Sequence, residues 1–426
     1  MLPPKTTCTW LLVYGLLTPY LLLVSCQQPE PTPPLSAEET QLVQALDQVI
    51  LPLKDADPTR KFTELRPLDS LFRPVQLVGL GEATHGTHEF FQMKARLFRY
   101  LVEQHGFRTL AFEASFGSCV GINRYIHGQS TSLKTATEAA KSIGYWAWRT
   151  TEVRDLIEWM RQYNQGKPAG EKLSFYGFDC QIRADNYPLI NEFVARVDPD
   201  TYAKLPQLYQ TLTRTGEIYE LFVANQINWV AAGGRLDYEL AKQAARVLVQ
   251  QQDLTGNGAC NRDRYMAENS QWLLSTLGAG KVSLWAHDHH VGNWSAYCGQ
   301  PMMGAYLKQR FGQRYLAVGQ SLSNGSFHAF DQGVISAFSV RSQQVPTSFN
   351  YLLGRTRQAN FALRLNQPLL ASSLLKWLTQ ERSLFEPGAF FDPTKQPDFY
   401  YAQSALVGRY DVLIHIRDTA PSEFLP

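Results

Sequence analysis

The sequence predicts an α/β fold, with a mainly parallel central sheet flanked by helices and an inserted helical subdomain. Short apolar runs that are typical of buried strands alternate with stretches whose apolar residues have helical spacing. A helix between two such runs implies a parallel pair, because the chain must cross back before the next strand begins. The strand-like runs are Val75–Leu80, Arg108–Ser115, Lys172–Cys180, Val282–Trp285, Tyr315–Gly319 and Asp411–Ile416.

The first predicted α/β part of the catalytic domain spans residues 37–184. Helical spacing of apolar residues predicts helices over Ala37–Leu53 and Phe90–His105. A third helix is expected over Trp146–Tyr163, with Thr150 or Thr151 as its N-cap. Each of the last two helices precedes a strand-like run, which gives the βαβ pattern of a parallel sheet.

The pattern changes between residues 185 and 277, where helical spacing continues without a notable strand-like run, as in Leu240–Gln252 and Arg262–Leu277. We interpret this range as a helical subdomain that either covers the strand ends as a lid or serves structural packing only. Strand-like runs resume in residues 278–426. This second α/β part is therefore expected to complete the sheet of the first part.

The N-terminus, residues 1–26, has the features of a bacterial lipoprotein signal peptide. The apolar stretch Trp10–Val24 is interrupted by Pro19 and is too short for an ordinary membrane span, which needs about 20 residues. Its end resembles a lipobox, which makes Cys26 the expected lipidation site. Residues 27–36 are rich in Pro and Gln and suit a flexible tether. We expect a lipid-anchored protein of the bacterial cell envelope, facing the periplasm or exterior; a plain secretory signal is the alternative.

The composition limits the kinds of molecule that the protein can be expected to bind. The chain of 426 residues has 40 basic and 38 acidic residues, for a formal charge of +2, and no basic stripe, so we expect no nucleic-acid partner. Outside the predicted signal peptide, four cysteines could form up to two disulfides in an oxidising compartment. Their spacing is not that of a zinc site. These cysteines are Cys119, Cys180, Cys260 and Cys298.

Charged and imidazole side chains follow several of the strand-like runs at the point where each run ends. The turn GEATHGTHEF, residues 81–90, comes directly after the first run, and WAHDHHVGN spans the end of the run that begins at Val282. Ligands bind beyond the carboxyl ends of parallel strands in open α/β sheets. We therefore expect one site at this edge. Its expected members are Glu82, His85, Glu113, Asp179, His287 and His290.

These residue types predict the hydrolysis of an acyl bond by activated water. A histidine near its usual pKa can take a proton from water at neutral pH if a partner fixes its tautomer, and His85 is the best candidate for this base. Glu82 or Glu113 would hold the imidazole. His287 or His290 would polarise a carbonyl or stabilise an oxyanion.

Two other kinds of protein stay open at this point. His287 and His289 form an H-x-H pair that, with His85 and the strand-end carboxylates, could hold one or two divalent ions, although no H-E-x-x-H motif is present. We predict no cofactor, with a divalent metal as the alternative. A serine hydrolase has less support, because Gly319–Ser323 lacks the second glycine of a nucleophile elbow. A surface lipoprotein that binds a ligand without turnover is the non-enzymatic alternative.

Several of these motifs resemble the erythromycin esterase family in order and rough spacing. They are GEATHGTHEFF, FEAS, WAWRTTEV, FYGFD, RDRYMAEN and WAHDHHVGN, and they cover most of the chain after residue 60. The resemblance implies an α/β core with a helical region and a hydrolase that opens a macrolide lactone with water, as in macrolide resistance, without a covalent enzyme intermediate. It implies that His85 is the general base, Glu82 and Glu113 its acidic partners, and His287 and His290 the other site histidines.

The expected small-molecule partner is an ester or macrolactone. Side chains of the motifs and strand ends are expected to contact it, and these are His88, Lys94, Trp146, Arg149, Tyr176 and Asp179. Family members often have arginine where Lys94 stands, and a lysine cannot supply the same planar fork to a substrate oxygen. His88 is at a variable position. Because the family is broad, the resemblance supports the reaction type better than it supports a macrolide.

Overall fold

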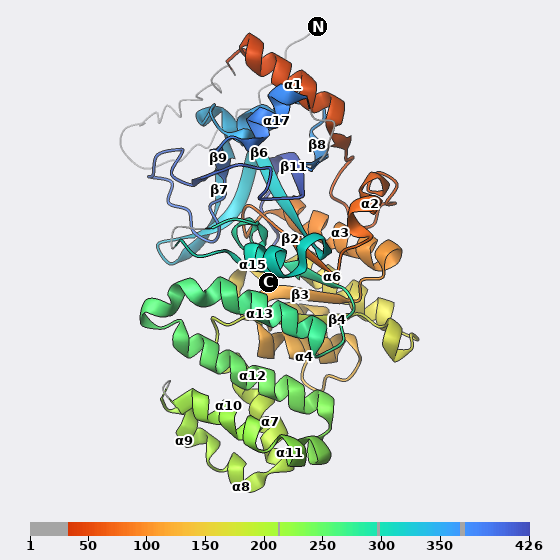
Figure 1. Cartoon of the computed structure of the whole chain (residues 1–426), viewed down its shortest axis with the longest axis vertical. Coiled ribbons are helices and arrows are strands. Elements are labelled where there is room, and N and C mark those ends of the chain that lie inside the picture. The colour runs from red at the N-terminus through yellow and green to blue at the C-terminus, as the bar shows by residue number, and fades with distance from the viewer. Residues whose placement is uncertain (1–32, 212–213, 296–298, 367–370) are drawn as a thin grey trace, which may run out of the picture. The chain divides into compact units, whose positions relative to one another are not determined.

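A nine-stranded sheet is the central feature of the computed structural model, which describes residues 33–211, 214–295, 299–366 and 371–426 (Figure 1). The strand order is β1-β8-β11-β6-β2-β5-β3-β4, and β7 pairs with β6 outside this path. β9 and β10 form a separate two-stranded sheet. The strands are β1 (Leu51–Pro52), β2 (Leu77–Leu80), β3 (Thr109–Ser115), β4 (Ser174–Asp179), β5 (Val282–Trp285), β6 (Tyr315–Asp331), β7 (Val334–Arg341), β8 (Asn360–Arg364), β9 (Arg382–Phe385), β10 (Tyr401–Ser404) and β11 (Val412–Thr419).

The middle of the sheet is parallel, from β11 through β6, β2, β5 and β3 to β4. Antiparallel pairing joins β1 to β8, β8 to β11 and β7 to β6. The predicted α/β class with a mainly parallel sheet is thus confirmed. All six predicted strands are present, but β6 continues to Asp331, well past the expected end at Gly319, because its second half pairs with β7.

Helices cover both faces of the sheet. The helices are α1 (Ala37–Val49), α2 (Asp69–Phe72), α3 (His88–His105), α4 (Phe116–Ile126), α5 (Ala136–Lys141), α6 (Thr151–Asn164), α7 (Tyr187–Val197), α8 (Pro199–Tyr202), α9 (Leu205–Tyr209), α10 (Thr215–Ala224), α11 (Gln226–Gly233), α12 (Arg235–Asp253), α13 (Arg262–Ser275), α14 (Asp288–Val291), α15 (Met303–Phe311), α16 (Phe349–Leu353) and α17 (Ser372–Thr379). Two hydrophobic clusters form the core. Successive side chains of a strand point to opposite faces, so Leu77 belongs to one cluster and Val78 to the other.

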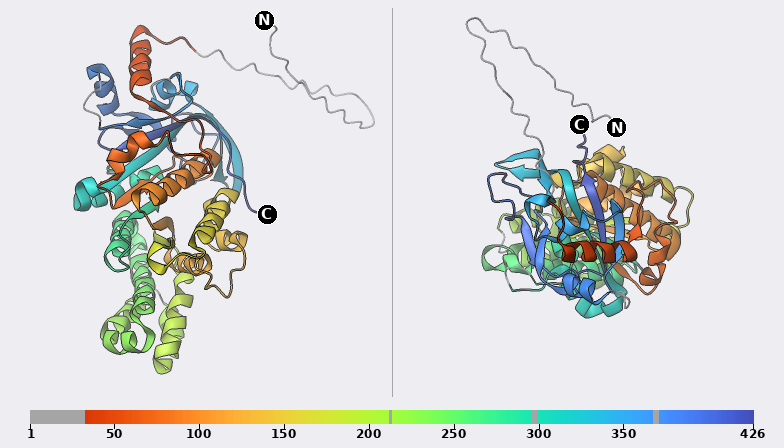
Figure 2. Two further views of the ribbon diagram at one scale, coloured as in Figure 1. Left: turned by 90° about the vertical axis from the view of Figure 1, so that its right-hand side faces the viewer. Right: turned by 90° about the horizontal axis from the view of Figure 1, so that it is seen from above.

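The helices from α7 to α12 group together away from the sheet. They lie at the opposite end of the molecule from α1 and α17 in Figure 1, and the left view of Figure 2 agrees. Their shared core is aromatic, with Phe193, Phe222, Trp229 and Tyr238 in mutual ring contact. This group and α13 fall in the range 185–277, and α13 returns the chain to the sheet, where it contacts β4.

The predicted helix over Trp146–Tyr163 is two separate elements. A short 3-10 helix, η2, spans Trp146–Trp148, and α6 begins only at Thr151. The break comes from Thr150, whose extended backbone and side-chain oxygen cap α6 by accepting from the Val153 N–H. The first predicted cap candidate is therefore the one that is used.

Cys119 and Cys180 are buried and free, so of the up to two disulfides that the sequence allowed, neither involves this pair. Cys260 is disulfide-bonded. Three predicted features lie outside the described residues. They are the signal peptide over residues 1–26 with Cys26, most of the tether over 27–36, and Cys298.

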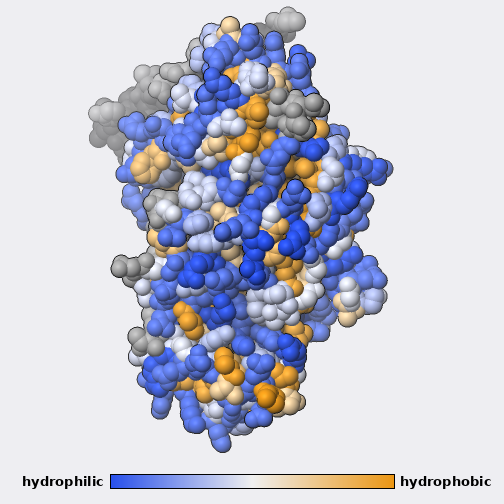
Figure 3. Space-filling view, in the orientation of Figure 1, coloured by the Kyte–Doolittle hydropathy of each residue, from blue (hydrophilic) through white to orange (hydrophobic). Residues whose placement is uncertain are grey.

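Within the described ranges no helix is long and apolar enough to cross a membrane. The face of the molecule in Figure 3 is mostly hydrophilic, with hydrophobic side chains in small areas.

Candidate active site

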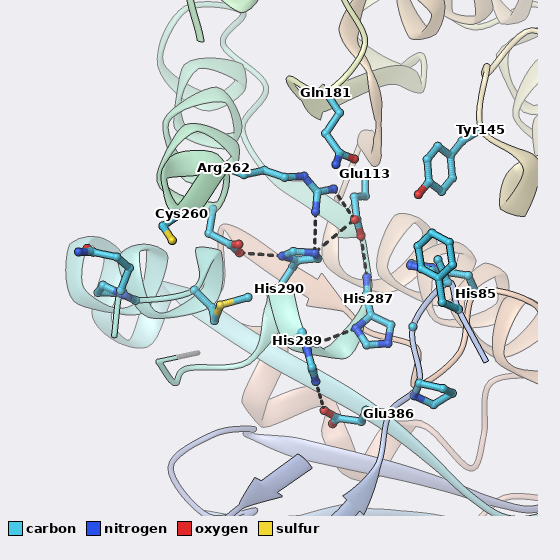
Figure 4. Close-up of a pocket in the computed structure, with 18 residues that line it drawn as sticks. His85, Glu113, Tyr145, Gln181, Cys260, Arg262, His287, His289, His290 and Glu386 are labelled. Atoms are coloured by element: carbon cyan, nitrogen blue, oxygen red, sulfur yellow. Dashed lines mark hydrogen bonds and ion pairs between the residues drawn. The ribbon is translucent and has the colours of Figure 1, made fainter. Parts of the chain in front are cut away.

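A cavity of about 650 Å³ lies beyond the carboxyl ends of β2, β3 and β5 (Figure 4). Its position is the one expected for a ligand in a parallel sheet, and its volume is in the range of small-molecule sites. The lining residues are His85, Glu113, Tyr145, Gln181, Cys260, Arg262, Asp263, His287, His289, His290, Gln300, Pro301, Met302, Glu386, Pro387, Gly388, Ala389 and Phe390.

The turn after β2 places His85 in this cavity because two glycines let the turn pack closely. A Cβ atom on Gly81 would overlap Asp288, and one on Gly86 would overlap the backbone of His328. Side chains at either position would push the turn away from α14 or β6. The two glycines thus allow the turn to pack closely on its neighbours, and this close packing sets the position of His85 in the cavity.

Glu82 fixes the orientation of the His85 ring. The Nδ1 atom of His85 lies 3.0 Å from Glu82 Oε1, and because a carboxylate can only accept, Nδ1 carries the hydrogen. Nε2 is then the nitrogen available in the cavity. The ring also lies edge-on to Trp148 at 5.5 Å between centroids. Burial lowers the pKa of His85 to about 4, although Glu113 opposes this shift, so the imidazole is neutral at neutral pH.

Lys94 does not line the cavity, although it was expected to contact the substrate. It is fully buried on α3 and forms an ion pair with the second oxygen of Glu82. Its ammonium also donates to Ala286 O at 3.1 Å and lies 4.4 Å from the centre of the Trp285 ring. Burial lowers the pKa of Lys94 well below its usual value. Lys94 is thus the partner of Glu82, behind the base.

Glu113, at the end of β3, joins the strand ends. Its Oε2 accepts from the His287 backbone N–H at 2.9 Å, and its Oε1 lies 2.6 Å from Arg262 Nη2 and 3.3 Å from His290 Nε2. Burial would raise the pKa of Glu113, but His290 and Arg262 hold it well below its usual value. The carboxylate is therefore ionised, and both of its oxygens have protein partners.

His287 has both ring nitrogens engaged. Its Nδ1 accepts from the His289 N–H at 3.2 Å, so its Nε2 carries the hydrogen and donates to Ala83 O at 3.0 Å. Burial lowers the pKa of His287 well below its usual value. The neutral ring lies 5.1 Å from that of His85. In this arrangement His287 supports the wall beside the base and has no hydrogen left for a substrate oxygen.

His290 is held by groups from α13. Its Nδ1 lies 2.7 Å from Asp263 Oδ1, and its Nε2 lies 3.1 Å from Arg262 Nη1. Burial alone would lower the pKa of His290, but Asp263 and Glu113 raise it. Asp179, at the end of β4, accepts from Arg262 with both oxygens at 3.0 Å, so this predicted site residue acts by holding the guanidinium.

The opposite wall carries a second charged cluster, centred on Glu386. Glu386 follows β9 and has no polar sequence motif around it. Its carboxylate lies 2.8 Å from His289 Nε2 and 2.7 Å from Arg409 Nη2, and it accepts from Tyr410 OH at 3.0 Å. Burial would raise the pKa of Glu386, but Arg409 and His289 hold it well below its usual value. The segment that continues to Phe390 closes this side of the cavity.

Four predicted substrate contacts lie elsewhere. His88 faces another hollow, where its Nδ1 lies 2.5 Å from Glu152 Oε1. Trp146 packs against Phe330 and Phe424. The remaining two are Arg149, which is exposed, and Tyr176, which is buried in the core against Phe116. The expected convergence holds for Glu82, His85, Glu113, Asp179, His287 and His290.

The sequence analysis missed Arg262, Asp263, Tyr145 and Glu386 as site residues, and it considered His289 only as a possible metal ligand. The start of RDRYMAEN, at the N-terminus of a predicted helix, was the one available signal for Arg262 and Asp263. As to metals, the described residues contain no group of three or more His, Cys, Asp or Glu side chains arranged to hold an ion.

Known proteins match this chain in sequence. The family model for erythromycin esterase matches residues 102–419. Erythromycin esterase type II of Escherichia coli is 23% identical over 339 residues, which cover 68% of this chain and 79% of that protein. YbfO of Bacillus subtilis, a protein named as a hydrolase, is 25% identical over 325 residues, which cover 63% of this chain and 69% of that protein.

Solved structures match in fold. A Bacillus cereus protein is 24% identical with a TM-score of 0.80, covering 92% of this chain and all (100%) of that chain. A structure described as a succinoglycan biosynthesis protein is 25% identical with a TM-score of 0.78 and the same coverage of 92% and 100%. An erythromycin esterase in an open conformation is 14% identical with a TM-score of 0.65, covering 87% and 97%. The family match spans most of the chain and supports a hydrolase, and the chain belongs to the erythromycin esterase family.

Proposed function

We propose that this protein hydrolyses a carboxylic ester or lactone, with His85 as the general base that activates water. The observation that carries the proposal is the position of His85, whose Nδ1 lies on Glu82 while the ring lines a cavity large enough for a substrate. A neutral imidazole with one nitrogen held by a carboxylate is the arrangement that general-base catalysis needs. The family supplies the hydrolase class.

In the proposed reaction, His85 Nε2 takes a proton from a water molecule as the water oxygen attacks the acyl carbon. The imidazolium that forms is stabilised by Glu82, whose second oxygen contacts Lys94. When the tetrahedral intermediate collapses, the imidazolium returns the proton to the alkoxide leaving group. One water is consumed, and one acid and one alcohol are formed, without a covalent bond to the enzyme.

Glu113 and His290 are proposed to shape the site through Arg262. Because the Arg262 guanidinium binds Glu113, Asp179 and His290 together, it fixes the carboxyl ends of β3 and β4 against α13. Its charge remains next to the acyl-binding region. We propose that His287 acts by holding the His85 ring in place, since both nitrogens of His287 are engaged.

The proposed substrate class includes macrolide lactones. Support comes from the name of the Escherichia coli relative, an erythromycin esterase, together with a cavity of about 650 Å³. We also propose that the protein acts at the bacterial cell envelope through a lipid on Cys26, which would bring it to compounds arriving from outside. The lipobox-like sequence before Cys26 supports this location.

The test is incubation of the purified protein with macrolides and simple esters, with and without a chelator, read by mass spectrometry. The proposal expects a gain of one water on at least one compound, unaffected by the chelator. Loss of turnover with chelator would instead favour a metal-dependent hydrolase at the same strand ends. Binding of a compound without any turnover would favour a non-catalytic ligand-binding lipoprotein.

A further inference from the structure

The polar groups of the cavity are nearly all bound to one another, and the hydroxyl of Tyr145 differs from them. Arg262 directs its donors at Asp179, Glu113 and His290, and both nitrogens of His290 are engaged. Tyr145 lines the same cavity, yet no hydrogen bond from its hydroxyl is found among the described residues. A phenol that is left without a protein partner in a cavity is available to a ligand.

Tyr145 lies on the side of the cavity where hydrolysis is proposed to occur. Its ring is 6.5 Å from that of His85 between centroids, in an edge-to-face arrangement. In Figure 4 its hydroxyl points toward the space between Glu113 and His85. An acyl group attacked by water on His85 would therefore have its carbonyl oxygen within reach of the phenol.

The local structure holds Tyr145 in this position. Tyr145 precedes η2, and the Trp148 N–H donates to its backbone oxygen at 3.3 Å. Trp148 is fully buried among Phe112 and Trp285, and its indole N–H donates to Glu113 O at 3.1 Å. The segment is thus tied to the end of β3, so the hydroxyl is placed before a substrate arrives.

The environment keeps the hydroxyl protonated. Burial raises the pKa of Tyr145, and the charge of Glu113 raises it further. The phenol is therefore a donor over the whole pH range in which His85 is a neutral base. Two amide donors, Gln181 and Gln300, also line the cavity, but both residues are exposed and therefore less constrained.

We propose that the Tyr145 hydroxyl is a further catalytic residue, which donates a hydrogen bond to the substrate carbonyl oxygen as that oxygen becomes an oxyanion. This inference rests on the proposed hydrolase function. It places the hydrogen-bond donor for the oxyanion on the side of the cavity formed by η2. His287 and His290, the donors expected from the sequence, already form hydrogen bonds with protein groups. No covalent step involves Tyr145, and its proton stays on the phenol oxygen.

The test compares wild type with Tyr145→Phe, which removes only the hydroxyl, and with Tyr163→Phe on α6 as a control outside the cavity. The substrates are p-nitrophenyl butyrate and erythromycin, and the inhibitor is a phosphonate analogue of the tetrahedral intermediate. We expect Tyr145→Phe to lower kcat/KM by about 10²-fold and to weaken phosphonate binding by a similar factor, with KM little changed, because the hydrogen bond strengthens in the transition state. Tyr163→Phe should match wild type.

A structural role for Tyr145 predicts a different result, in which kcat and thermal stability fall while the ratio of phosphonate to substrate binding is unchanged. Tyr145→Gln is the second variant, since its amide can donate, and it should recover part of the activity lost in Tyr145→Phe. Wild-type kcat/KM in Tyr145→Phe would overturn this assignment and leave the hydrolase proposal standing. No turnover of either substrate by wild type would overturn both.

Discussion

The Nδ1 atom of His85 lies 3.0 Å from Glu82 Oε1, while the other oxygen of the same carboxylate forms an ion pair with Lys94. Glu82 and Lys94 are completely buried, and His85 is only 6% exposed. A carboxylate in such a place is stable as an ion only if a cation balances it. The three residues therefore form one unit, in which Lys94 pairs with Glu82 and Glu82 holds the His85 ring.

His85→Ala should lower hydrolysis by about 10²-fold or more, because it removes the group proposed to take the proton from water. Steady-state kinetics on any ester that the wild type turns over would measure the change. The control is His88→Ala, since His88 is three residues further along the chain but contacts Glu152 in another hollow. Equal losses in the two variants would contradict the assignment of His85 as the base.

Lys94→Met should destabilise the protein by about 3–5 kcal/mol, because it leaves the Glu82 carboxylate buried without its counter-charge. Chemical denaturation would measure the free energy of unfolding. Lys395→Met is a suitable control, since that side chain is 48% exposed and its removal should change stability by less than about 0.5 kcal/mol. A Lys94 variant as stable as this control would show that Glu82 does not need the cation.

Much of the candidate site follows from the order of the strands. Glu82 and His287 follow β2 and β5, Glu113 lies near the end of β3, and parallel strands bring their carboxyl ends to one edge. This rule needs only the position of a residue relative to a strand, which an apolar run reveals. The α/β class was predicted separately, from the alternation of strand-like runs with helical spacing.

The remaining site residues depend on tertiary packing that no local pattern encodes. Glu386 reaches the cavity because its segment packs on β6, through the bridge between Phe330 and Phe390. Lys94 is a surface residue by type, yet its position on α3 directs it under Glu82. The engagement of both His287 nitrogens is set by backbone groups of Ala83 and His289. β7 and β8 were missed because they pair at the antiparallel side of the sheet.

The dependence of hydrolysis on pH should reflect the low basicity of His85. Burial lowers the pKa of His85 to about 4, so the ring stays neutral, and able to accept a proton, well below the usual histidine value of about 6.5. We expect kcat/KM to hold from neutral pH down to about pH 5 and to fall near pH 4. A pH profile of kcat/KM would measure this, and a fall centred near pH 6.5 would indicate a base other than this buried imidazole.

The stability of the fold should decrease in mild acid. Burial lowers the pKa of His415 to about 3 and that of His85 to about 4, whereas in the unfolded chain both are near 6.5. As the pH falls below about 6.5, the unfolded state therefore binds protons that the folded state does not, and the free energy of unfolding declines. Urea unfolding at several pH values would measure the decline. His415→Asn should reduce it, because the core position between Ser321 and Ser323 then has no titrating ring.

The most direct test of direct water attack is turnover of a susceptible ester or macrolactone in water enriched in heavy oxygen. The products and the intact protein would be analysed by mass spectrometry. We expect one heavy oxygen in the carboxylic acid product, none in the alcohol, and no mass added to the protein during turnover. Heavy oxygen in the alcohol, or an acyl group on the protein, would contradict the proposal that His85 activates water for attack on the acyl carbon.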